Sequence, residues 1–160
     1  MVAKSKVGLL YQEIKNVLSQ DTTLKTYVNN IDSIYEGFRE DLFVDQQYLL
    51  MLELVEDRET VITFPNFIKI DVDIDIYCCM NQIDYDKQTV DIADFARDVK
   101  NCLWSKIPDF VNNSYLAMNG KANKFRLVRT PYLSWGMDKY SWKAGIIRME
   151  SEIYTTAQGR

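Results

Sequence analysis

Residues 67–80, with the sequence FIKIDVDIDIYCCM, alternate apolar and charged side chains at almost every step. Successive side chains of a β-strand point to opposite faces, so this pattern predicts a strand with one face in the core. The predicted core face has five β-branched residues: Ile68, Ile70, Val72, Ile74 and Ile76. The opposite face carries one lysine and a row of three carboxylates: Lys69, Asp71, Asp73 and Asp75. At the usual strand rise these carboxylates lie about 6.6 Å apart, and water or a partner must accommodate them.

The composition is that of a globular protein, with 47% hydrophobic and 26% charged residues in 160 residues. This length suits one domain, which we assign to residues 1–160. The formal net charge of −4 argues against binding nucleic acid by charge neutralisation, which needs a basic face. Four cations form the best local basic patch, although a solvated loop and strand edge has the same composition: Lys121, Lys124, Arg126 and Arg129.

No secretory signal and no segment long enough to span a bilayer is expected, so no membrane partner is predicted. The three cysteines are Cys78, Cys79 and Cys102, an odd set without C-x-x-C spacing. They predict buried thiols in a reducing compartment and no disulfide framework.

The spacing of apolar residues predicts the order α-α-β-β-β-α-β-β, an α+β fold with helices on one face of a largely antiparallel sheet. The predicted helices are 7–18, a short helix capped by Asp21, and 91–104; the predicted strands are 34–39, 47–56, 67–80, 124–130 and 144–154. The charged residues 56–60 are predicted to form a turn, and residues 131–143 a long connection rich in aromatic side chains.

Residues that carry out catalysis are scarce in this sequence. It contains no histidine, and it lacks both the G-x-G-x-x-G pattern and the P-loop pattern. The Asp71, Asp73, Asp75 row fails as a calcium loop, because Ile76 stands where glycine is needed and Gln82 where glutamate is needed. We therefore expect no enzyme, no cofactor and no metal.

Three interpretations of the aspartate row remain open: a solvated sheet face, an electronegative functional surface and a metal site completed by neighbouring residues. The aromatic connection also has two interpretations. Its members are Tyr132, Trp135, Tyr140 and Trp142. Aromatic side chains anchor interfaces, and they also close the end of a core, which we favour for Trp142.

Several segments in their chain order resemble the tail terminator, or tail completion, proteins of long-tailed bacteriophages. These are LLYQEIKNVL at 9–18, DTTLKTYV at 21–28, IYEGF at 34–38, the long strand pair, the helix at 91–104 and a C-terminal strand at 145–154. The resemblance covers nearly the whole chain and is one of topology and texture, without a signature motif.

The resemblance implies a non-enzymatic structural subunit of the virion tail, assembled in the bacterial host cytoplasm. Such subunits form a ring, usually a hexamer, that caps the tail tube and joins it to the head connector. The implied partners are further copies of this chain, the tail tube protein and the connector protein, with DNA only in transit through the pore. Asp71, Asp73 and Asp75 are then candidates for the pore lining, and Tyr132, Trp135 and Tyr140 for the subunit interface.

Two alternatives are kept beside this interpretation. A head-tail connector, or neck, protein of the same particle shares much of the same texture. A monomeric intracellular adaptor domain that binds a peptide at a sheet edge belongs to a different class. A carboxylate-dependent metalloenzyme is a third possibility, which a rise in thermal stability on adding a divalent metal would support.

Overall fold

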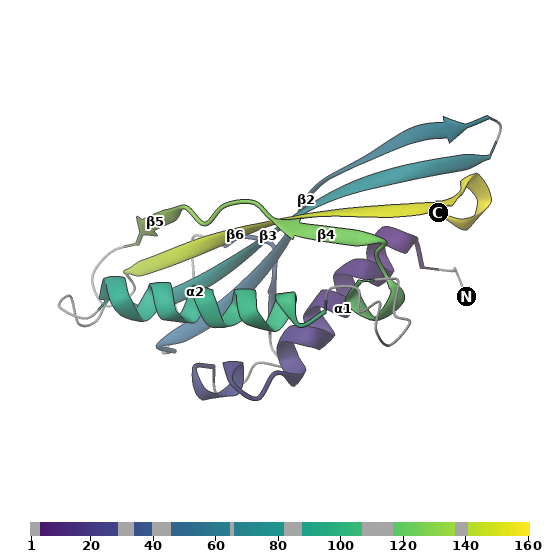
Figure 1. Cartoon of the computed structure of the whole chain (residues 1–160). Helices are drawn as coiled ribbons and strands as arrows, with labels where there is room; N and C mark the ends of the chain where they lie inside the picture. The colour runs from purple at the N-terminus through teal and green to yellow at the C-terminus, as the bar shows by residue number, and fades with distance from the viewer. Residues whose placement is uncertain are drawn as a thin grey trace.

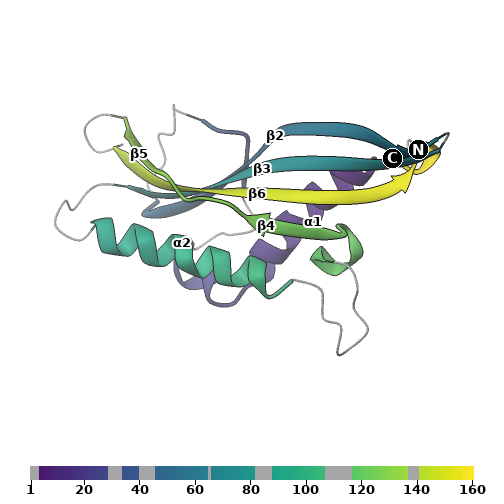
Figure 2. The same cartoon turned by 45° about the horizontal axis from the view of Figure 1, so that its top comes forward.

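A computed structural model of the chain describes residues 4–28, 34–39, 46–64, 66–81, 88–106, 117–136 and 141–160. These residues form two α-helices and a six-stranded, mostly antiparallel sheet. The helices are α1 (Lys6–Gln20) and α2 (Gln88–Trp104). The strands are β1 (Tyr35–Glu36), β2 (Tyr48–Thr63), β3 (Phe67–Asn81), β4 (Lys124–Leu127), β5 (Tyr132–Trp135) and β6 (Trp142–Thr156). Their order across the sheet is β1-β2-β3-β6-β4, and β5 also pairs with β6 (Figures 1 and 2).

Strand β3 is the central strand of the sheet. It pairs with β2 on one side and along its whole length with β6 on the other, both antiparallel. The five residues predicted for its core face are between 0% and 3% exposed and belong to the main core cluster. The prediction made from the alternating pattern is therefore confirmed for this face.

Both helices pack on the core face of β3, and Figure 2 shows them together on one side of the sheet. Helix α1 begins after Ser5, whose hydroxyl accepts a hydrogen bond from the N–H of Gly8 at 3.0 Å and so caps the helix. It buries an apolar stripe at helical spacing: Val7, Leu10, Ile14, Val17 and Leu18. No helix in the described part of the chain has the length and apolar character needed to cross a membrane.

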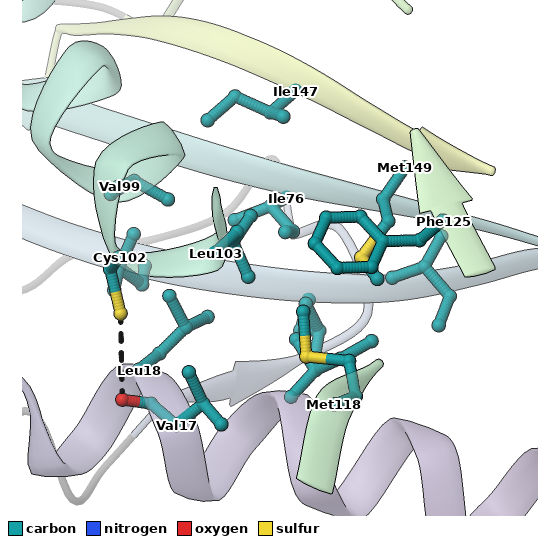
Figure 3. Packing of buried hydrophobic residues seen from close by; sticks show 14 of the residues in the cluster. Val17, Leu18, Ile76, Val99, Cys102, Leu103, Met118, Phe125, Ile147 and Met149 are labelled. Atoms are coloured by element: carbon teal, nitrogen blue, oxygen red, sulfur yellow. Dashed lines mark hydrogen bonds between the residues drawn. The ribbon is translucent and has the colours of Figure 1, made fainter. Parts of the chain in front are cut away.

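The two helices meet beneath the sheet. Figure 3 shows the thiol of Cys102 on α2 pointing to the backbone carbonyl of Val17 on α1, at 3.6 Å. Beside this contact, Met118, Phe125 and Met149 close one end of the core. All three cysteines are free and buried, as predicted from their spacing.

The helices and long strands predicted from periodicity are confirmed in their main extent. The short second helix is reduced to one 3₁₀ turn, Leu24–Thr26, and the carboxylate of Asp21 accepts from the N–H of Leu24 at 2.9 Å. The strand predicted at 34–39 is reduced to β1, which pairs in parallel with β2 at Met51 and Leu52.

Two predictions of local structure are wrong. Residues 56–60 do not form a turn but continue β2, because they pair with residues 69–73 of β3 and the pairing extends as far as Thr63 and Phe67. The aromatic connection is not a loop throughout, because Tyr132–Trp135 forms β5 along the first residues of β6. Arg58 of the charged run lies opposite Asp71, whereas Asp57 and Glu59 lie opposite Val72 and Ile70. The backbone pairing with β3 therefore keeps the charged run in the strand.

Phe95 on α2 is fully buried and its ring contacts those of Tyr27 and Tyr48, with centroids 4.9 Å and 5.3 Å away. Phe95→Ala is expected to lower the free energy of unfolding by about 3–5 kcal/mol, since it opens a cavity between α2 and the sheet. Asn101→Ala, at an exposed position of the same helix, should change it by less than about 0.5 kcal/mol. Urea unfolding measures both, and equal losses would contradict this packing.

Candidate functional site: the charged face of the sheet

The three aspartates lie on the face of the sheet that the helices leave uncovered, here called the charged face. Asp71 is half-buried, whereas Asp73 and Asp75 are only 8% and 7% exposed. A fully solvated row is thus wrong for Asp73 and Asp75. Their burial raises the question of how the charges are compensated, because an unpaired buried carboxylate is costly.

Asp75 has the best partner of the three. The Arg148 guanidinium on β6 donates from Nη2 to Oδ2 at 2.9 Å and also from Nε to Oδ1, which makes the pair bidentate. Arg148 and Asp75 face each other directly in the β3–β6 ladder. This hydrogen bonding raises the pKa of Arg148 well above its ordinary value. The pair fixes the register of two strands and leaves Asp75 little free negative charge.

Asp73 is the least compensated of the three. Its ion-pair partner is Arg58 on β2, with Nη1 at 3.7 Å from Oδ2, and the same guanidinium nitrogen lies closer to Glu56, at 2.9 Å. Burial raises the pKa of Asp73, and the positive charge of Arg58 opposes the rise only in part. The charge of Asp73 therefore costs folding free energy at neutral pH.

The remaining charges on this face are also arranged in pairs. Lys69 lies 3.1 Å from Asp71, Lys124 lies 3.2 Å from Glu152, and Arg126 lies 2.6 Å from Glu150. From β2, β3, β4 and β6 the described residues place seven carboxylates and five cations here: Glu53, Glu56, Asp71, Asp73, Asp75, Glu150 and Glu152 against Arg58, Lys69, Lys124, Arg126 and Arg148. These four strands therefore place two more carboxylates than cations on the charged face, and Arg129, which lines a smaller hollow with Asp75 and Arg148, reduces the excess to one.

A shallow hollow of about 430 Å³ lies on the charged face. Its lining includes Arg58, Asp73, Lys124 and Glu150, so both signs of charge surround it. Within the described residues no cluster of three or more carboxylate or cysteine side chains is placed to hold a metal ion. The aspartates follow one strand at its regular spacing and do not converge on a common point.

Beyond Asp75 the same face becomes apolar. A second core cluster forms there from Leu49, Met51, Tyr77, Cys79, Trp142 and Ala144. Trp142 is fully buried, which confirms its predicted place in the core.

The aromatic interface candidates separate in the structure. Trp135 is half-buried, packs against the second cluster and meets the Phe38 ring edge-on with centroids 5.3 Å apart. Tyr132 is 46% exposed, which suits an interface residue better. Tyr140 lies outside the described residues.

The sequence interpretation missed one feature, the exposed apolar residues of the β2–β3 hairpin. This distal hairpin comprises the described residues 54–64 and 66–72 (Figure 1). Phe64 at its tip is 88% exposed, Val61 is 62% exposed and Phe67 is 41% exposed. The sequence signal for this feature is the apolar run VITFPNF at 61–67. It was overlooked because residues 56–60 were assigned to a turn, so residues 61–67 were not recognised as the end of a long hairpin.

No protein-family model and no curated protein matches this chain. Its function is therefore inferred from its own residues and from the resemblance in element order.

Asp73→Asn is expected to raise the melting temperature at pH 7 by roughly 2–4 °C, the response of a chain of this size to about 1 kcal/mol. Because the native pKa of Asp73 lies above the unfolded one, its penalty develops as pH rises from about 3.8 to the native pKa, is complete above the native pKa and is absent well below 3.8. The gain should therefore vanish near pH 3. Asp71→Asn, which removes the same charge at a half-buried position, is the control and should give no gain. A gain independent of pH would contradict this account.

Trp135→Ala is expected to lower the free energy of unfolding by about 2 kcal/mol or more, since its ring packs on the second cluster. Tyr132→Ala, three positions earlier on the same strand, should lower it by less than about 1 kcal/mol, because the side chain is largely exposed. Chemical denaturation followed by tryptophan or tyrosine fluorescence and by circular dichroism measures both. The opposite ranking would return Trp135 to the set of interface residues.

Proposed function

We propose that this chain is a non-enzymatic subunit that assembles into a ring, a hexamer in the family it resembles, which caps a phage tail tube and joins the tail to the head. The observation that carries the proposal is the distal hairpin with its exposed apolar side chains. Phe64, Val61 and Ile62 are 88%, 62% and 47% exposed in a chain whose core is otherwise well buried. Apolar surface concentrated in one projecting element is typical of a protein that buries it against a partner.

A ring requires a contact between two different surfaces of the same chain, repeated through a rotation that closes. The described structure has such different surfaces, because α1 and α2 lie on one face of the sheet (Figure 2) and the paired charges of β2, β3, β4 and β6 lie on the other. Flat subunits of this kind can stand side by side around an axis, with one face inward and one outward.

The charged face is the proposed wall of the channel. Among the described residues this face has one more carboxylate than cations once Arg129, which lines a hollow beside Asp75 and Arg148, is included. The surface is weakly negative, and the phosphate backbone finds no net attraction on it. Asp71 would contribute most of the three aspartates, because Asp73 and Asp75 are buried within the subunit. The negative wall proposed from the sequence is thereby reduced to a face of nearly balanced charge.

The proposed partners are the tail tube protein on one end of the ring and the head connector on the other, with DNA in transit. A neck protein of the same particle would use the same surfaces and differ only in which neighbours it contacts. The helical layer, on the outside in this arrangement, would not contact DNA.

The order of neighbouring genes tests this proposal directly. We expect the flanking DNA to encode a portal or head-completion protein upstream and a tube protein and tape-measure protein downstream. A position between head and tail genes without a tube gene next to it would favour the neck protein. Flanking genes for metabolism or signalling would contradict both.

A peptide-binding adaptor is the second candidate, favoured by the exposed outer edge of β2 beyond Leu52. An extended peptide adds to such an edge through backbone hydrogen bonds. An adaptor stays monomeric at every concentration, whereas the ring subunit self-associates. Sedimentation velocity between 1 and 100 µM separates the two.

A further inference from the structure

Among the described strands, the sheet has two edges that no further strand extends. On the β2 side, β1 pairs only with Met51 and Leu52, and every residue from Leu54 to Thr63 is exposed. Within the described part of the chain no strand pairs with residues 54–63 of β2 on that side. Apart from its two bulges, this edge presents unpaired backbone groups that can accept another strand.

The opposite edge is formed by residues 124–135, which follow β6 as β4, a short connection and β5. Backbone hydrogen bonds continue the pairing through the connection, from Val128 N–H to Arg148 O at 3.0 Å and from Ile146 N–H to Pro131 O at 2.9 Å. Figure 2 shows β2 and β4 at the two margins of the strands β2, β3, β6 and β4. Exposed residues recur along this edge: Lys124, Arg126, Val128, Arg129, Pro131, Tyr132 and Ser134.

The two edges carry opposite charges. Residues 56–59 of β2 are EDRE, three carboxylates and one cation. Residues 117–136 contain four cations and no carboxylate. These four cations form the local basic patch noted in the sequence: Lys121, Lys124, Arg126 and Arg129. The negative net charge of the chain argues against nucleic acid as the partner of this patch.

The directions of the strands allow the two edges to join. Each neighbouring pair in the series β2, β3, β6 and β4 is antiparallel, so β2 and β4 run in opposite directions. A second copy rotated about an axis along the strands keeps these directions and presents its β2 antiparallel to β4 of the first. The sheet can thus continue from one copy to the next with ordinary antiparallel pairing.

Side chains on the β2 edge and on the β4 edge also lie at matching positions along the strand direction. Glu56 pairs with Asp73, Asp73 with Glu150 and Glu150 with Arg126, which places Glu56 and Arg126 at one level on opposite margins. Through the same rows Leu54 is level with Leu127. Arg58 is level with Lys124, which would bring two positive charges together. The carboxylate of Glu56, whose Oε2 lies 2.9 Å from Nη1 of Arg58, reduces this repulsion. β-Bulges next to Leu54 and Val61 limit the regular stretch of the β2 edge.

We propose that neighbouring copies join edge to edge, with the β2 edge at residues 56–61 of one copy against the β4 edge, at and next to Lys124–Leu127, of the next. This contact is the subunit interface of the proposed ring, and its closure into a ring rests on the proposed function. A two-fold contact is disfavoured, since β2 against β2 opposes carboxylates and β4 against β4 opposes cations. The head-to-tail contact instead brings an edge of net negative charge to an edge of net positive charge, and such a contact repeats until a ring closes.

Two charge-reversal variants test this contact. Asp57→Lys/Glu59→Lys changes the β2 edge, and Lys121→Glu/Arg129→Glu reverses the two cations that flank β4 on either side. Asp57, Lys121 and Arg129 have no ion-pair partner among the described residues, and Glu59 has only Arg160 at 3.4 Å, so the fold should be preserved. Lys4→Glu/Lys25→Glu reverses two exposed cations elsewhere and is the control. Circular dichroism verifies the fold of each.

Native mass spectrometry and light scattering then give the oligomeric state. Each edge variant alone should dissociate at concentrations at least tenfold above those at which the wild-type ring dissociates, while the control stays assembled. Mixed in equal amounts, the two edge variants should restore a ring of wild-type size with alternating copies. An edge variant that assembles normally by itself would overturn the proposed contact and leave the ring in place. A wild-type chain that is monomeric at about 100 µM would overturn the ring as well.

Discussion

The antiparallel pairing of β3 on both sides is the constraint on which the rest of the structure depends. With β2 and β6 along its edges, β3 can turn its side chains only to the two faces of the sheet. Its isoleucines form the apolar surface on which both helices pack. Its aspartates must then lie on the opposite face, where Asp73 and Asp75 are buried from water. The same alternation that builds the core therefore requires cations on the neighbouring strands.

The flanking strands supply these cations in register. Arg148 on β6 neutralises Asp75 by a bidentate pair, while Arg58 on β2 only approaches Asp73. The difference is one of geometry. The guanidinium of Arg148 lies directly across the ladder from Asp75 and forms two hydrogen bonds to its carboxylate, whereas the guanidinium of Arg58 is shared between Asp73 and Glu56 and does not. A face built from such pairs is nearly neutral. The charges that remain lie at the two edges of the sheet, negative along residues 56–59 of β2 and positive along residues 117–136. This distribution suits a subunit that joins its neighbours at its edges and leaves its charged face free.

How much of this was accessible from the sequence depends on the range of the interaction. The period-two pattern of β3 and the helical stripes of α1 and α2 are local, and the structure confirms them. The strand character of Glu56–Thr60 was missed because its stability comes from pairing with β3, which no local propensity reports. The burial of Asp73 and Asp75 and the packing of Trp135 on Phe38 depend on register and on a neighbouring strand for the same reason. Tyr132 and Trp135 were interface candidates on the same local evidence, and only the structure separates them, because Tyr132 is 46% exposed and Trp135 packs on the second cluster.

Electron cryomicroscopy of the purified, assembled protein tests the central claim most directly, because it shows ring closure, the contact between copies and the direction of each face in one map. The account predicts a closed ring in which the sheet continues from β2 of one copy to β4 of the next, with Asp71 facing the channel. A ring whose charged face points outward, or one whose copies meet through their helices, would contradict it.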